Sequence, residues 1–295
     1  MADVEKMIVN STVRIVTCDW NMECRLDLFT NNGFRITEKG KTDTQHQPGK
    51  YSIHSPLYGT DYSDESAFED RYSCTCGKRV GASYKNTKCP FCGDTVEYID
   101  IDLRKTGWII LDKDVIIQPE FYKKIQSIIG TRLLSNMLEY KDESTRNASE
   151  KFDGIGYTEF IDRFDEILNY YIRKKPGKID QYNFIMAHKS MVFANCIPVY
   201  SSHLRPFIIR AEEIRYSDED KMFRRIFSNS VLLNDKYELA RRVEVAKKRA
   251  TPNRKTIDGL RKDALLANIQ ADLNSLWNLS FETIKKKTGQ TLLSA

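Results

Sequence analysis

Apolar positions change their spacing along the chain, and this change separates an extended N-terminal part from a helical remainder. Residues 8–17 are rich in β-branched side chains, and 96–103 alternate apolar and polar positions. Two short apolar runs follow at 108–111 and 115–117. All four patterns predict β-strands. Polar residues with several Gly and Pro fill 31–58, which predicts an extended loop.

From residue 119 onward, apolar side chains recur every three or four positions, as on one face of a helix. The spacing predicts helices over 119–140, 157–174 and 180–195. Pro119 begins the first of them, where proline suits the first helical turn. The polar segment 141–156 is expected to be a surface loop.

The C-terminal third predicts two long helices that form an antiparallel hairpin. Residues 218 to about 250 contain no Pro or Gly, 251–253 interrupt the pattern, and 256–277 resume it. A heptad-like seam lies on the returning helix at Leu266, Ile269, Leu273 and Leu276. The tip of the hairpin, 236–255, carries eight Lys or Arg against two Glu. Such a run is either a binding surface or an ordinary solvated face.

The amino-acid composition argues against several classes of protein. The chain has 295 residues, enough for about two domains, and its net charge is +5. A mean hydropathy of −0.51 and 29% charged residues argue against a membrane protein. Fifteen Tyr and 14 Phe argue against disorder. The polar first residues contain no apolar stretch of the signal-peptide kind, so we expect a cytoplasmic protein.

Four of the seven cysteines lie within 19 residues and form two close pairs, Cys74/Cys76 and Cys89/Cys92. Two such pairs supply the four thiolates that a tetrahedral structural Zn²⁺ requires. Gly77 and Gly93 follow the pairs, where a tight turn needs positive φ. The spacing predicts a zinc ribbon at about 70–95, with a redox pair or two disulfides as alternatives.

The three scattered cysteines, Cys18, Cys24 and Cys196, are expected to be core thiols. The chain has four His and lacks HExxH, GxxxxGK[ST] and GxGxxG motifs. These absences exclude the corresponding metalloprotease, P-loop and dinucleotide-binding sites.

The cysteine segment and its surroundings resemble the N-terminal part of the β′ subunit of multisubunit DNA-directed RNA polymerases. The segment 74–93 is similar to the zinc-binding segment of that family, and 49–59 to the stretch that precedes it. Residues 197–206 (IPVYSSHLRP) look like the stretch that leads into the lid, and 218–227 like the start of the clamp helices. Residues 281–290 resemble the approach to the second switch region. The chain looks most like the split β′ polypeptides of giant bacteriophages.

The resemblance implies a mixed α+β clamp with a zinc ribbon and a long helical hairpin. It divides the chain into an N-terminal clamp region with the ribbon, a mostly helical clamp body, a lid-like loop, the clamp-helix hairpin and the start of a switch region. Their respective bounds are 1–115, 116–208, 209–217, 218–279 and 280–295.

The resemblance also implies roles for basic residues. Lid and switch contacts to nucleic acid would involve Arg205, Arg210, Arg215, Lys285, Lys286 and Lys287. A promoter-specificity factor would dock on Arg241, Arg242, Lys248 and Arg249. For each of these residues the alternative is a solvated side chain.

The family's catalytic NADFDGD motif is missing from this chain. The resemblance therefore implies that another chain binds the catalytic Mg²⁺ and that this chain alone is inactive. The expected partners are the C-terminal β′ part, β-type chains, a specificity factor, template DNA and transcript, in the cytoplasm of an infected bacterial host or packaged in a virion. Two other functions stay open: a free-standing zinc-ribbon DNA-binding regulator, and a coiled-coil adaptor with a structural zinc.

Overall fold

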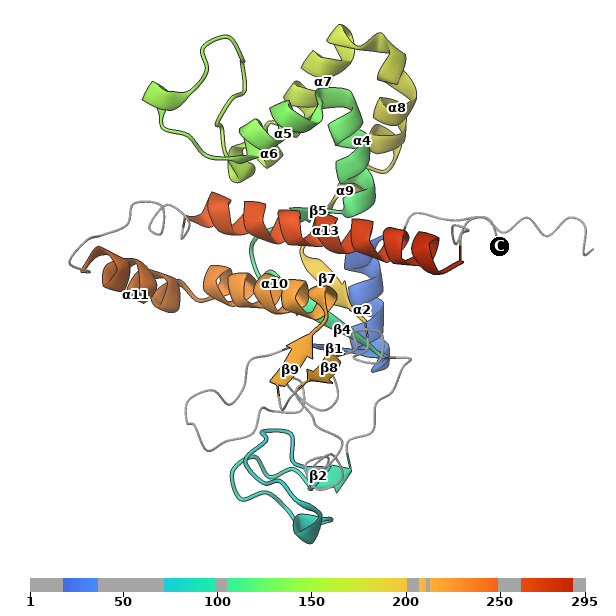
Figure 1. Ribbon diagram of the computed structural model, residues 1–295, viewed down its shortest axis with the longest axis vertical. Coiled ribbons are helices and arrows are strands. Elements are labelled where there is room, and N and C mark those ends of the chain that lie inside the picture. The colour runs from blue at the N-terminus through green and yellow to red at the C-terminus, as the bar shows by residue number, and fades with distance from the viewer. Residues whose placement is uncertain are drawn as a thin grey trace, which may run out of the picture.

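The computed structural model describes residues 18–36, 72–98, 105–200, 207–210, 213–248 and 261–288. The parts of the chain follow one long axis (Figure 1). The cysteine-containing unit lies at one end, a group of short helices lies at the other, and the long C-terminal helices lie between them. The expected strand 8–17 and the expected turn 251–253 fall outside the described residues.

A small three-stranded sheet lies beside the C-terminal helices. Its central strand β4 (Thr106–Ile110) pairs in parallel with β1 (Gly33–Arg35) and antiparallel with β7 (Cys196–Val199). Successive residues Trp108 and Ile109 are both at most 3% exposed, so both faces of β4 are covered. The expected strand at 108–111 is therefore confirmed, while β1 lies within a segment expected to be loop.

Helix α2 (Trp20–Thr30) covers this sheet and was not expected from the apolar spacing. The side chain of Asp19 caps it by accepting hydrogen bonds from the backbone N–H groups of Asn21 (3.0 Å) and Met22 (3.2 Å). Its apolar side chains lie on both faces, so the sequence shows no clear amphipathic period.

The helical end of the molecule contains shorter helices than the sequence predicts. They are α4 (Pro119–Ile129), α5 (Thr131–Leu138), α6 (Tyr157–Asp162), α7 (Phe164–Lys174), α8 (Ile179–Ala187) and α9 (Lys189–Val192). Gly130 divides the first expected helix because its φ of 111° is not helical. Arg163, with ψ of 17°, divides the second. The third expectation is wrong beyond Val192, because β6 (Phe193–Ala194) pairs there with β5 (Ile116–Ile117).

The polar segment 141–156 contains only a short 3-10 helix, η2 (Glu143–Thr145), but it is not wholly a surface loop. Phe152 is fully buried, and the buried carboxylate of Asp153 accepts a hydrogen bond from Lys141 Nζ at 2.8 Å. Phe152 and Ile155 therefore anchor a mostly polar segment to the core.

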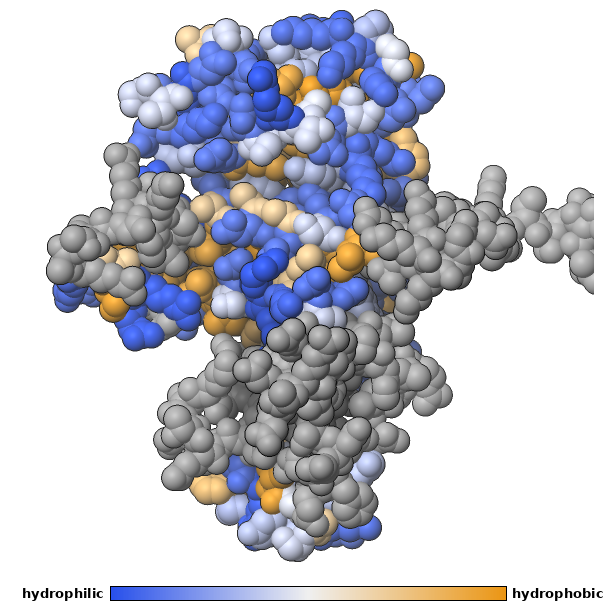
Figure 2. Space-filling view, viewed as in Figure 1, coloured by the Kyte–Doolittle hydropathy of each residue, from blue (hydrophilic) through white to orange (hydrophobic). Residues whose placement is uncertain are grey.

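Helices α10 (Asp218–Asn234) and α13 (Lys262–Thr288) form the predicted antiparallel pair (Figure 1). All four residues of the predicted seam on α13 are at most 5% exposed. The guanidinium of Arg225 bridges the two helices by donating to both carboxylate oxygens of Asp272. Apolar residues remain visible along the band of these two helices, whereas the short-helix end is mostly hydrophilic on the same face (Figure 2).

The outgoing helix is not continuous, contrary to the expectation for 218–250. It stops at Asn234, and α11 (Lys236–Lys247) continues after an extended Asp235. Asn234 is held by β4 and the loop after it, because its Nδ2 donates to the carbonyl of Ile110 (2.8 Å) and its Oδ1 accepts from the N–H of Asp112 (3.0 Å). The returning helix extends past the expected end at 277, to Thr288.

Within the described ranges, none of the helices has the length and apolar character needed to cross a membrane.

A buried glutamine on α13 forms hydrogen bonds with β5, and replacing it tests how much these bonds contribute to the stability of the fold. Gln270 Oε1 accepts from the N–H of Ile117 (2.9 Å) and the hydroxyl of Tyr157 (2.6 Å), and its Nε2 donates to the carbonyl of Ile117 (2.9 Å). We expect Gln270→Ala to lower the free energy of unfolding by about 2 kcal/mol or more, because buried polar groups lose their partners. Chemical denaturation measures this change.

Asn268→Ala is the matched control, since Asn268 is an exposed amide on the same helix. Its effect should stay within about 0.5 kcal/mol. Equal effects of the two substitutions would contradict a structural role for the buried amide.

Candidate metal centre

The cysteine unit is a small ribbon closed by one pair of strands. β2 (Tyr72–Ser73) pairs antiparallel with β3 (Glu97–Tyr98), the part of the predicted strand 96–103 that the structure describes. Each cysteine pair lies on a tight turn that ends in glycine. Gly77 N donates to Cys74 O at 3.0 Å, and Gly93 N donates to Cys89 O at 2.9 Å. The φ angles of the two glycines, 72° and 77°, confirm the predicted positive values.

The two turns bring the sulfur atoms of Cys74, Cys76, Cys89 and Cys92 together. All four lie within 4.8 Å of one another, and the Cys74–Cys76 and Cys76–Cys89 separations are 3.4 Å and 3.8 Å. Ligands at about 2.3 Å from a tetrahedral zinc ion would lie ~3.8 Å apart. The measured separations exceed a covalent S–S bond of about 2.05 Å. The cluster could therefore hold a metal ion such as zinc.

The ribbon depends on this cluster because it has almost no other core. Its buried apolar residues are Tyr72, Cys74, Cys89 and Val96, so two of the four belong to the sulfur cluster itself. A core of this size cannot offset the conformational entropy of the segment by apolar burial alone. Bound metal would supply the missing stabilisation, as it does in small zinc-dependent modules.

Without metal, the thiols differ in how readily they lose protons. Burial raises the pKa of the Cys76 thiol to about 12. Burial acts in the same direction on Cys89, but hydrogen bonds from the backbone N–H groups of Cys92 and Phe91 and from neighbouring thiols lower its pKa to about 6. Metal ions bind thiolates, so binding must displace the remaining protons. Affinity for zinc should consequently fall as the pH falls.

The segment 209–217, which the resemblance predicts to be a lid-like loop, coincides with an antiparallel hairpin. β8 (Phe207–Arg210) pairs antiparallel with β9 (Glu213–Tyr216), and the register sets Ile208 opposite Arg215 and Arg210 opposite Glu213. Arg210 and Arg215 thus belong to one two-stranded unit directly before α10. Arg205 lies outside the described residues.

The other basic residues that were predicted to bind nucleic acid or a specificity factor lie far from the ribbon in sequence, and those that the structure describes fall on or directly after two different helices. Lys285, Lys286 and Lys287 fall in the last turns of α13, whereas Arg241 and Arg242 are exposed on α11. Lys248 follows that helix and pairs with Glu244, and Arg249 lies outside the described part. Arg241 and Arg242 therefore share one exposed helix.

A contact between two scattered cysteines was not foreseen. Cys24 and Cys196 are buried together against Trp108, and the thiol of Cys196 donates to the carbonyl of Trp20 at 3.1 Å. Side-chain hydrogen bonding with Cys196 lowers the pKa of Cys24. Both are core thiols, as predicted, but Cys18 is exposed. Their separation of 172 positions gave no signal in the sequence.

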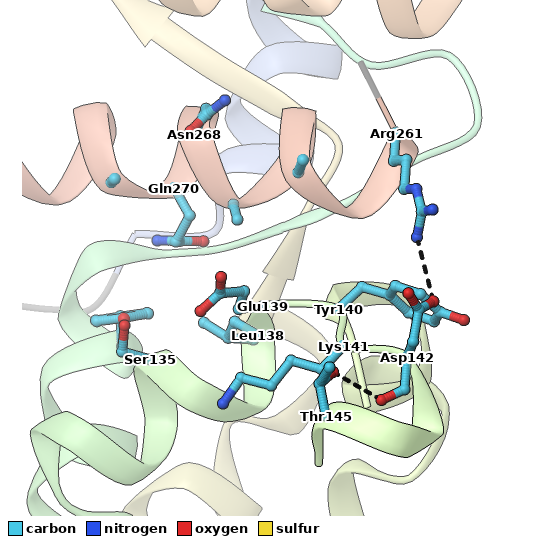
Figure 3. A pocket seen from close by; sticks show the side chains of 14 residues that line it. Ser135, Leu138, Glu139, Tyr140, Lys141, Asp142, Thr145, Arg261, Asn268 and Gln270 are labelled. Atoms are coloured by element: carbon cyan, nitrogen blue, oxygen red, sulfur yellow. Dashed lines mark hydrogen bonds and ion pairs between the residues drawn. The ribbon is translucent and has the colours of Figure 1, made fainter. Parts of the chain in front are cut away.

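A hollow of about 740 Å³ lies between α13 and the segment after α5 (Figure 3). Arg261 reaches from the start of α13 toward Asp142 at 3.9 Å, and Thr145 Oγ1 donates to the Asp142 carbonyl at 2.8 Å. No cysteine or histidine is among the residues lining this hollow. It therefore lacks the ligands that transition metals prefer.

No protein-family model matches the chain, and no curated protein matches it either. The resemblance to the polymerase subunit consequently rests on the quoted motifs and their order.

Removing one ligand tests the metal centre. We expect the purified protein to contain stoichiometric zinc, and Cys76→Ser to lose most of it, because three thiolates bind zinc far more weakly than four. Backbone amides at 74–93 should then exchange hydrogen rapidly, while those of α10 and α13 stay protected. Zinc content and hydrogen exchange measure the two effects.

Cys18→Ser serves as the control, since Cys18 is an exposed thiol outside the cluster. It should keep its zinc at neutral pH and release it on acidification like the unmodified protein. Retention of full zinc content by Cys76→Ser would rule out the four-sulfur site.

Proposed function

We propose that this chain is the clamp-forming N-terminal part of the β′ subunit of a DNA-dependent RNA polymerase, most like the split β′ chains of giant bacteriophages. One observation carries the proposal, namely the order of features along the chain. The four-sulfur ribbon comes first, the motif at 197–206 leads directly into the β8–β9 hairpin, and the antiparallel pair α10 and α13 follows. The resemblance implies this same order of ribbon, lid and clamp helices.

In this function the chain acts mechanically and electrostatically. The clamp would close over DNA, and its cations would neutralise phosphates without reading the sequence. The β8–β9 hairpin would separate transcript from template at the edge of the hybrid. Nucleotidyl transfer with Mg²⁺ would take place on another chain, in the cytoplasm of the infected cell.

The exposed face of α2 supports assembly with other chains. Met22, Leu26 and Phe29 follow the i, i+4, i+7 spacing of one helix face and are 64%, 49% and 86% exposed. An outer helix face normally carries polar residues, whereas this one adds apolar surface to the covered inner face. Apolar surface of this kind marks interaction sites. It fits a polymerase subunit better than a free-standing regulator.

Affinity purification of the tagged chain from its native context tests the proposal. We expect near-stoichiometric partners that carry NADFDGD and β-type sequences. The double substitution Met22→Glu, Phe29→Glu should reduce their recovery at least several-fold, because it places charges in an apolar interface.

Ile179→Glu is the control, since Ile179 is a 46% exposed apolar residue at the start of α8, among the short helices and away from α2 (Figure 1). It should leave partner recovery unchanged. Recovery of the unmodified chain as a lone monomer would refute the polymerase function and favour the zinc-ribbon regulator.

Charge reversal on α11 tests the expected docking site of the specificity factor. In the purified polymerase, Arg241→Glu combined with Arg242→Glu should lower promoter-dependent transcription about tenfold or more, because like charges across an interface repel. Transcription from nicked or tailed DNA, which needs no promoter recognition, should stay unchanged.

Lys236→Glu, at the opposite end of the same helix, is the matched control. An equal loss in both assays for the double variant would show a general defect of the clamp and contradict a docking role.

A further inference from the structure

Two exposed aromatic rings on the ribbon each lie beneath a cation. Phe91 is 66% exposed, and Lys78 Nζ lies 4.8 Å from its ring centroid. Tyr84 is 38% exposed, and Arg79 Cζ lies 4.4 Å from its ring centroid. The two cations are consecutive in the chain, so one short segment supplies the cation–π contact to both rings.

Neither ring belongs to the core of the ribbon, yet the backbone around each is well fixed. Phe91 lies inside the second cysteine turn, which Gly93 N closes on Cys89 O at 2.9 Å. Tyr84 lies in the 3-10 helix η1 (Ala82–Tyr84), where its carbonyl accepts from Thr87 Oγ1 at 2.6 Å. Rings on fixed backbone lose little freedom when a ligand covers them, so they suit stacking.

The ribbon cations have no acidic partner among the described residues. Lys78, Arg79, Lys85 and Lys88 form no ion pair there, and the segment 72–98 contains only two acidic residues, Asp94 and Glu97. A four-thiolate zinc centre would add two negative charges at the middle of the ribbon. Positive charge is therefore peripheral, close to the exposed rings.

We propose that this surface of the ribbon binds single-stranded nucleic acid by stacking bases on Phe91 and Tyr84. The face of each ring opposite its cation would receive a base, and the lysines and Arg79 would contact neighbouring phosphates. A duplex cannot bind in this way because the faces of its bases are already stacked on one another. An acidic peptide would use the cations but would leave the rings without a role.

The ribbon is well placed for such a ligand, because it projects at one end of the molecule, away from the short helices (Figure 1). Apolar residues are visible on its surface beside hydrophilic ones (Figure 2). The inference does not depend on the polymerase function, since a free-standing ribbon protein could use the same rings.

Fluorescence anisotropy with the full-length, zinc-loaded protein tests the inference. The probes are labelled oligo(dT) and oligo(U) of about 12 nucleotides, and a duplex of the same length. Phe91→Ala and Tyr84→Ala should each weaken binding of a single strand about 5-fold or more, whereas Phe91→Trp should restore it, because any large ring can stack. Duplex binding should be the same for all variants. A higher affinity for oligo(dT) would identify the ligand as single-stranded DNA, and a higher affinity for oligo(U) would identify it as RNA.

Tyr140→Ala is the matched control because Tyr140 is a 43% exposed ring outside the ribbon, with Arg261 Cζ 5.2 Å from its centroid. It should bind the single strands like the unmodified protein. Zinc content confirms that each variant keeps its ribbon, and Phe91→Leu replaces Phe91→Ala if the latter loses zinc. Unchanged affinity for single strands in the ring variants, or an equal loss for the duplex, would overturn the inference.

Discussion

The burial of α13 on more than one side is the constraint on which most of this fold depends. The helix packs against α10 and also against α4, α6 and β5. Because it is covered in this way, residues outside its heptad-like seam are buried too, including Leu265 and Gln270. The side chain of Gln270 forms hydrogen bonds with the backbone of β5. Asp263 accepts hydrogen bonds from the N–H and the hydroxyl of Thr158, both at 2.7 Å, close to the start of α6. One helix thereby positions both the sheet region and the short helices.

The ribbon contains too little apolar surface to be stabilised in the way that α13 is. Its few buried apolar groups include two of the cysteines themselves, so a metal held by the four sulfurs would supply the stabilisation that apolar burial supplies for α13. The two parts can therefore respond separately to chelation and to denaturant. Such independence would suit the proposed binding of nucleic acid by the ribbon at the end of the molecule while the helical body keeps its shape.

The proposed functions place charge and apolar surface on different elements. Exposed arginines lie on α11, and cations paired with rings lie on the ribbon, whereas α2 presents an apolar face. Electrostatic contacts give fast, salt-dependent association with nucleic acid, and apolar contacts give durable association between subunits. A polymerase clamp needs both kinds of contact, one for DNA and one for assembly.

The sequence by itself determined features whose causes are local. The cysteine spacing and the two glycines predicted the four-sulfur cluster, because ligands on tight turns need no distant contact to come together. The seam at Leu266, Ile269, Leu273 and Leu276 likewise predicted the buried face of α13, because helical spacing alone aligns these side chains.

Only the tertiary structure decided features that depend on contacts between distant segments. Helix α2 is apolar on both faces, so no period revealed it, and its inner face is defined by the sheet beneath it. The break after Asn234 follows from its bonds to Ile110 and Asp112, more than a hundred residues earlier. The pairing of Phe91 with Lys78 and of Tyr84 with Arg79 exists only in the folded ribbon, where each cation lies over its ring. Spacing along the chain records none of these contacts.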